Sequence, residues 1–349
     1  MKPGIIKILK FSAFLALGIL LLYFAFKGID FQSIKEDFRN VEYSWVLFSL
    51  VFSILSHISR AMRWNILIEP LGFNPRLKNT FYSLMVGYLA NFAFPRIGEI
   101  TRCAGLGKKE NIPVDKLVGT VIVERMIDLM SLVILLGILI IFRFETFGTF
   151  FRESVFIPLG EKISQTLAFS MFIWIIFGGG IVISIILYII FREQLSQIKI
   201  VSRGKNIIKG IAEGLKSVYM LRKRGKFLFH TAFIWMNYWL MTWVVVFALP
   251  ATSDLKLIDG LFLLVIGGFG MSAPVQSGIG AYHWIVSRGL VAVYAGITLE
   301  EGLVFATISH EAQSLLVILL GSLSFILLFR KQKIKGKLSL SEEKMKEAL

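Results

Sequence analysis

Long apolar runs separated by short charged stretches dominate the chain. A helix needs about 20 apolar residues to cross the hydrocarbon core of a membrane, since each residue rises about 1.5 Å. Several runs reach that length, so the pattern predicts an all-α, polytopic transmembrane helix bundle with about six full spans. We expect these spans at about 5–26, 43–66, 117–142, 169–191, 228–250 and 303–329.

Two further apolar segments, 79–107 and 257–297, are interrupted by proline and turn residues. Proline removes a backbone donor and clashes with the preceding helical turn, so Pro95 and Pro274 should each break a helix. The loop after the first segment is basic, and a full crossing would place it outside, against the positive-inside rule. We therefore predict two re-entrant hairpins that enter the membrane from opposite sides, the first from the inside.

Composition and charge agree with this architecture. Hydrophobic residues make up 56% of the chain, which is too much for a soluble domain. The formal net charge is +15, and the basic residues lie mostly in loops beside spans. The positive-inside rule requires this distribution, so the charge does not indicate a nucleic-acid partner. The same rule predicts a multi-pass membrane protein with both termini in the cytoplasm.

The remaining polar stretches fit a single membrane domain. The segment 198–221 is strongly basic and carries apolar residues at helical spacing, which predicts an amphipathic helix on the inner leaflet. The last residues, 338–349, are polar and predict a cytoplasmic tail. We expect residues 1–337 to form one integral membrane domain.

The first predicted hairpin concentrates ionisable residues at its break. If the helix resumes directly after Pro95, then Arg96, Glu99 and Arg102 fall at i, i+3 and i+6 and share one face. Charges beside an apolar run are costly in lipid unless they line a cavity or pair with one another. This stretch, with Asn91 just before it, is therefore predicted to carry the working charges of the protein.

The third predicted span adds three charges within an otherwise apolar run. Glu124 and Asp128 lie at i and i+4 on one helix face, and Arg125 is placed to pair with Asp128. An intramembrane ionisable residue is a functional hypothesis by default. The alternative is a structural ion pair of Arg96 or Arg102 with Glu124 or Asp128, and both interpretations can hold together.

A basic group, Arg60-Ala61-Met62-Arg63-Trp64, ends the second predicted span. We interpret it as an interfacial anchor, with phosphate binding as the less favoured alternative.

The second predicted hairpin and the last span carry further polar residues. His310 and Glu311 are adjacent in the last span and form a candidate proton relay, although membrane histidines more often bond neighbouring helices. The candidate residues of the second hairpin are Pro274, Gln276, Gly278, Gly280 and His283.

Sequence motifs for catalysis are absent. The chain has no Gly-x-Ser-x-Gly, P-loop or His-Glu-x-x-His pattern, so we predict no catalytic residue, no metal site and no cofactor. Its single cysteine, Cys103, excludes an intrachain disulfide.

Four motifs in this order resemble the lysylphosphatidylglycerol synthase transmembrane region family, also called flippase-like. They are Arg60-x-x-Arg63-Trp64, then Asn91-x-x-x-Pro95-Arg96-x-Gly98-Glu99-x-x-Arg102, then Glu124-Arg125-x-x-Asp128, and finally Pro274-x-x-x-Gly278-x-Gly280. The resemblance covers about residues 10–330. It implies an integral inner-membrane protein that handles lipids with polar heads.

Two departures from the family limit what the resemblance implies. Some relatives carry a soluble aminoacyl-transferase domain, for which this chain has no room, so synthase activity is not expected. Many relatives place a glutamate three residues after the second glycine of the last motif, where this chain has His283.

The resemblance and the charge pattern together predict a lipid translocase or lipid-binding transporter for an anionic or phosphate-bearing membrane lipid. Guanidinium groups match phosphate oxygens. The head-group residues would be Arg96, Arg102, Arg125 and Asn91, with Glu99, Glu124 and Asp128 as supporting charges. One alternative is an intramembrane enzyme acting on a lipid phosphate, with Glu99 or Glu124 as base. The other is a non-catalytic partner of a lipid or envelope synthase.

Overall fold

The computed structural model describes residues 3–26, 30–143, 148 and 221–329. The predicted span 169–191, nearly all of the basic segment 198–221 and the tail 338–349 lie outside the described residues. Within the described ranges the chain forms helices and turns and no strand. The elements are α1 (Pro3–Phe26), α2 (Phe31–Arg39), α3 (Tyr43–Ile68), η1 (Glu69–Leu71), α4 (Leu77–Ala93), α5 (Gly98–Glu110), α6 (Val114–Phe142), α11 (Arg224–Val244), η3 (Val245–Ala248), η4 (Pro250–Thr252), α12 (Leu257–Ser272), η5 (Gln276–Gly278), α13 (Ala281–Val293) and α14 (Leu299–Phe329).

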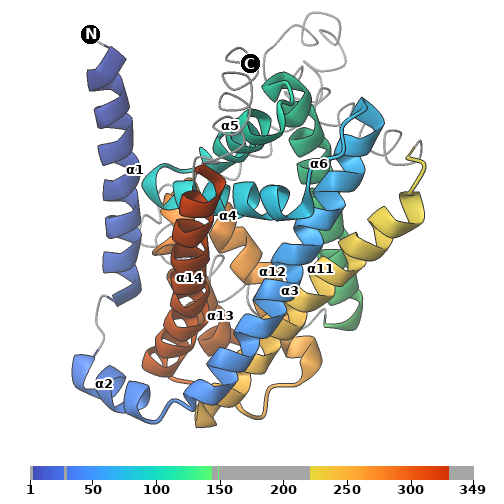
Figure 1. Cartoon of the computed structure of the whole chain (residues 1–349). Helices are drawn as coiled ribbons and strands as arrows, with labels where there is room; N and C mark the ends of the chain where they lie inside the picture. The colour runs from blue at the N-terminus through green and yellow to red at the C-terminus, as the bar shows by residue number, and fades with distance from the viewer. Residues whose placement is uncertain (1–2, 27–29, 144–147, 149–220, 330–349) are drawn as a thin grey trace, which may run out of the picture.

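Four helical stretches of the described chain are long and apolar enough to cross a membrane: Tyr43–Leu71, Val114–Phe142, Arg224–Ala248 and Leu299–Phe329. They coincide with four of the predicted spans, so the predicted all-α membrane bundle is confirmed. Helix α1 covers the first predicted span and stands at the edge of the bundle in Figure 1.

Helices α3 and α11 run side by side along the bundle (Figure 1). Their polar contacts lie in the interior: Ser59 Oγ is 2.8 Å from His230 Nδ1, and Arg60 Nη1 donates to Tyr238 Oη at 2.8 Å. The charged face of α6 packs against this pair of helices.

The first broken segment folds back on itself as α4 and α5. Their backbones touch at two glycines, and a Cβ on Gly87 would lie 2.7 Å from the carbonyl oxygen of Gly98. The side-chain oxygen of Asn91 accepts from the Gly98 N–H at 2.8 Å, at the start of α5. Because α5 has only 13 residues, it is too short to cross the membrane alone.

The second broken segment is formed by α12, η5 and α13. Its turn uses backbone in the left-handed region, with φ of 47° at Ser277, 79° at Gly278 and 82° at Gly280. A Cβ on Gly280 would also meet the carbonyl oxygen of Gly18 in α1 at 2.7 Å. Pro274 lies just after α12, where the structure ends that helix at Ser272.

The two hairpins meet at their tips. Arg96, in the turn between α4 and α5, donates from Nη2 to the carbonyl oxygen of Ser272 at 3.0 Å. In Figure 1 the α4–α5 arms lie in the upper part of the bundle and α12 and α13 in the lower part, while α14 packs against both hairpins. The hairpins therefore approach each other from opposite ends.

The expectation that Arg96, Glu99 and Arg102 share one helix face is wrong. Helix α5 begins only at Gly98, and Arg96 precedes it in a left-handed conformation with a φ of 62°. The turn after Pro95 thus rotates Arg96 away from the face that carries Arg102.

The glycine contact between the hairpin arms can be tested by Gly98→Ala. The new methyl group would enter the space of the Gly87 carbonyl oxygen and lie 2.7 Å from Asn91 Oδ1. We expect the free energy of unfolding to fall by about 1–3 kcal/mol, the usual cost of overpacking. The measurement is thermal unfolding of the purified protein in detergent.

Gly119→Ala is the matched control, because nothing lies within 4 Å of a Cβ at that helical position. It should leave stability unchanged or raise it slightly, since alanine is the better helix former. Equal unfolding temperatures for the two variants would contradict the close backbone approach of α4 and α5.

Candidate functional site

Glu124 of α6 is the centre of a buried network of charges. Its side chain is fully buried, and Oε1 lies 3.1 Å from Arg60 Nη2 and 3.2 Å from Arg102 Nη2. Oε2 accepts a further hydrogen bond from Arg102 Nη1 at 3.2 Å. Arg63 Nη2 is more distant, 3.8 Å from Oε1. One carboxylate therefore connects α6 with both α3 and α5.

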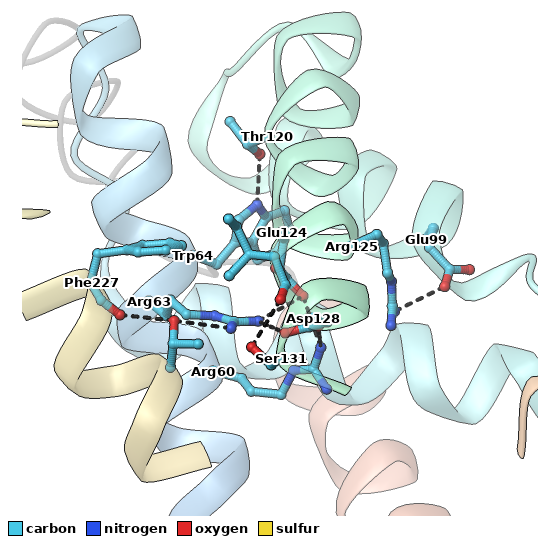
Figure 2. A network of polar contacts seen from close by, with 12 residues as sticks. Arg60, Arg63, Trp64, Glu99, Thr120, Glu124, Arg125, Asp128, Ser131 and Phe227 are labelled. Carbon is cyan, nitrogen blue, oxygen red and sulfur yellow. Dashed lines mark hydrogen bonds and ion pairs between the residues drawn. The ribbon is translucent and has the colours of Figure 1, made fainter. Parts of the chain in front are cut away.

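Asp128 extends the network by one helical turn. Its two oxygens accept from Arg60 Nη2 at 2.6 Å and from Arg63 Nη2 at 2.7 Å. Asp128 lies four residues after Glu124 and on the same face of α6, as the sequence spacing predicts. Figure 2 shows both carboxylates directed toward the arginines of α3.

Aromatic and hydroxyl groups complete the surroundings of the arginines. The guanidinium of Arg102 lies 4.6 Å from the ring centroid of Trp64, whose Nε1 donates to Thr120 Oγ1 at 2.8 Å. Arg63 lies over the Phe227 ring and donates to Thr231 Oγ1 at 3.3 Å. Helix α11 thus joins α3, α5 and α6 around the network.

The network holds three guanidinium groups and two carboxylates, so its formal charge is one positive unit. The Nε atoms of Arg60, Arg63 and Arg102 are buried and have no hydrogen-bond partner among the residues that the structure describes. Desolvation of these charges is costly, and their mutual pairing is the main interaction that offsets it. The network therefore fixes the relative positions of α3, α5 and α6.

A second ion pair lies on the opposite side of α6. Arg125 Nη2 is 2.9 Å from Glu99 Oε1, and the two side chains are 42% and 27% exposed. Figure 2 shows this pair directed away from the buried network. The prediction that Arg125 pairs with Asp128 is wrong, because Arg60 and Arg63 already bind both oxygens of Asp128.

The side chains of Arg125 and Glu99 line one part of an apolar groove between α5 and α6. The groove has a volume of about 410 Å³. Its other lining residues are Ile100, Val118, Val121, Ile122, Met126 and Leu129.

The remaining predicted residues of the first hairpin separate into distinct positions. Arg102 does pair with Glu124, as the structural interpretation predicts. Arg96 is exposed and bonded to Ser272, and it does not form the predicted ion pair with the carboxylates of α6. The Asn91 side-chain oxygen accepts a hydrogen bond from the backbone N–H of Gly98.

The sequence analysis missed Arg60 and Arg63 as members of the network. Both arginines and Trp64 are buried, with 7%, 0% and 0% exposure, so the interpretation as an interfacial anchor is wrong. The available signal was their i, i+3 spacing inside a predicted span, which matches the i, i+4 carboxylates of the next span.

The polar residues of the second hairpin and of α14 do come together. His310 Nδ1 is 2.9 Å from Glu311 Oε1, and His283 Nε2 is 3.6 Å from the same oxygen. His310 Nε2 also lies 2.9 Å from the carbonyl oxygen of Ser277. The turn that contains Gln276, Gly278 and Gly280 is thereby attached to α14. A proton relay at this cluster stays a prediction.

Fold and network define a multi-pass helical membrane protein with charged groups buried between its helices. Residues 11–321 match the family described as the lysylphosphatidylglycerol synthase TM region, and the chain belongs to that family. It is similar to a UPF0104 membrane protein of Methanocaldococcus jannaschii, at 25% identity over 302 residues, 78% of this chain and 84% of that protein. No solved structure matches the chain. The family resemblance derived from the motifs is thus confirmed.

Replacing the central carboxylate, Glu124→Gln, should strongly destabilise the protein. Arg60 and Arg63 would then keep Asp128, while Arg102 would lose the carboxylate that it contacts, and an unpaired buried charge costs about 3–5 kcal/mol. We expect a large fall in the unfolding temperature in detergent and a lower yield of monodisperse protein.

Glu69→Gln provides the comparison, because Glu69 pairs with Lys223 at 2.7 Å at an exposed site, with 34% and 45% exposure of the two side chains. Exposed pairs contribute about 0–1 kcal/mol, so this variant should behave nearly as wild type. A Glu124→Gln protein as stable as the Glu69→Gln protein would rule out a central structural role for the network.

Proposed function

We propose that this chain is a lipid translocase or lipid-binding transporter of the cell membrane, acting on an anionic or phosphate-bearing lipid. The observation that supports this most directly is the partly exposed Arg125–Glu99 pair, whose side chains line an apolar groove between α5 and α6. An apolar groove with one exchangeable cation fits a molecule that joins an acyl chain to a phosphate.

In this proposal, Arg125 binds the phosphate of the lipid head group. A charge on a membrane helix is costly unless it is paired or lines a site, and Arg125 retains a partner while remaining 42% exposed. A phosphate can replace Glu99 as that partner, because a guanidinium donates two parallel hydrogen bonds to phosphate oxygens. The aliphatic walls of the groove would hold the adjoining part of the lipid.

Arg96 is the second proposed contact for the head group. It is exposed at the place where the two hairpin tips meet, and its side chain donates a hydrogen bond to the Ser272 carbonyl oxygen. A lipid that leaves Arg125 would bind Arg96 next. The opposed hairpins suit this path, because paired interrupted helices are a recurring pointer to a transport site near the midplane.

Arg102 and Asn91 act in this proposal as positioning residues. Arg102 is 2% exposed and is committed to Glu124, so it holds α5 against α6 instead of meeting lipid. Asn91 fixes the start of α5 through Gly98. We also propose cytoplasmic termini, since the basic residues predict that orientation.

The proposal predicts that Arg125→Gln slows lipid movement. Charge-assisted hydrogen bonds contribute about 1.5–3 kcal/mol, which corresponds to a rate reduced about tenfold or more. The lipid exchange rate of Arg125→Lys should fall between those of wild type and Arg125→Gln, because an ammonium group keeps the charge and loses the planar fork. The measurement is leaflet exchange of fluorescent phosphatidylglycerol or polyprenyl phosphate in proteoliposomes, followed by chemical quenching of the outer leaflet.

Lys223→Gln serves as the control, because it also removes one positive charge and breaks one exposed ion pair, far from the groove in sequence. It should exchange lipid at the wild-type rate. Equal leaflet equilibration by wild type, Arg125→Gln and protein-free vesicles would refute the proposal. Mass spectrometry of the same lipids separates transport from chemistry: an altered lipid mass would favour the lipid-modifying enzyme instead.

A further inference from the structure

A compact group of possible metal ligands lies at the tip of the second hairpin, away from the arginine network. His283 comes from α13, and His310 and Glu311 come from α14. One ligand atom from each side chain lies within 4.8 Å of the other two. The two histidine side chains are only 3% and 5% exposed.

We propose that His283 Nε2, His310 Nδ1 and the Glu311 carboxylate bind a divalent transition metal ion of the zinc class. Zinc bonds to imidazole nitrogen and carboxylate oxygen measure about 2.0–2.2 Å, which separates tetrahedral ligand atoms by roughly 3.3–3.5 Å. The observed separations from Glu311 Oε1, 2.9 Å to His310 and 3.6 Å to His283, lie on either side of that value. Two histidines and one glutamate are a known zinc donor set.

The hydrogen bonds of His310 supply the second argument. Its Nε2 is 2.9 Å from the Ser277 carbonyl oxygen, which only accepts, so Nε2 carries the hydrogen. In that tautomer the Nδ1 lone pair faces Glu311 Oε1 at 2.9 Å. Two acceptors at this distance need a cation between them. Metal-binding histidines commonly donate their other N–H to a backbone carbonyl, as His310 does here.

His283 favours a metal ion over a single shared proton. A proton can join His310 to Glu311, but it leaves the His283 ring, whose Nε2 faces the same oxygen, without a bond of its own. A metal ion would bond to His283 Nε2, His310 Nδ1 and the Glu311 carboxylate at once.

The position gives the metal ion a structural consequence. The carbonyl that orients His310 belongs to Ser277, in the left-handed turn of the hairpin tip. A bound ion would therefore connect α13, α14 and that turn at one point. The Glu311 side chain is 42% exposed, which leaves room for water at the fourth tetrahedral position.

The test is metal binding by the full-length protein, purified in detergent without a polyhistidine tag. After treatment with a chelator and reloading with Zn²⁺, we expect about one ion per chain by elemental mass spectrometry. Glu311→Gln and His283→Gln should each weaken binding by tenfold or more. His230→Gln, at a histidine that contacts Ser59 on another helix, is the matched control and should keep wild-type binding.

A second measurement needs no variant. Co²⁺ in place of Zn²⁺ should give the visible spectrum of a tetrahedral nitrogen and oxygen site, and Zn²⁺ should protect His283 and His310, but not His230, from acylation. Absence of bound metal in the wild type would overturn the proposal and leave a proton shared by His310 and Glu311. Equal Zn²⁺ binding by wild type and Glu311→Gln would overturn it as well.

Discussion

The pairing of buried guanidinium and carboxylate groups is the constraint on which this structure depends. Isolated charges between membrane helices would be prohibitively costly, so Glu124 and Asp128 must remain within reach of Arg60, Arg63 and Arg102. The five side chains come from α3, α5 and α6. Any rotation or sliding of one helix would break several ion pairs together, and this fixes the helices more tightly than apolar packing in lipid does.

The same principle explains how two short hairpins exist inside a helical bundle. The last carbonyl groups of a helix have no partner within the helix, and a membrane interior offers no water to them. The Ser272 carbonyl at the end of α12 accepts from Arg96, and the Ser277 carbonyl accepts from His310. Both carbonyls belong to the tip of the second hairpin, and each receives its donor from another element; the Arg96 cation at the carboxyl end of α12 is also favoured by the helix dipole. In the first hairpin, the Gly98 N–H at the start of α5 is bonded by the Asn91 side chain.

The sequence predicted the features that depend on local chemistry. Apolar length marked four spans that the structure contains, and Pro95 and Pro274 marked both breaks. The sequence did not predict which arginine pairs with which carboxylate, because this depends on how α3 is rotated against α6. The sequence pattern of Arg60 and Arg63 is typical of interfacial anchors, yet both side chains are buried. The backbone of Arg96 shows the same limit, since a left-handed residue ahead of α5 changes which side chains share a face.

The structure separates a buried network of charges from the partly exposed Arg125–Glu99 pair. Releasing Arg102 to bind a lipid would leave Glu124 with fewer partners in a fully buried site, and breaking a buried pair is costly. The Arg125–Glu99 pair lies outside that network, and its side chains are 42% and 27% exposed, so a phosphate that replaced Glu99 would break no ion pair of the buried network. The proposed function therefore assigns reversible lipid binding to Arg125. The buried network serves that site indirectly, since Arg102 and Glu124 hold together the two helices whose facing sides form the groove.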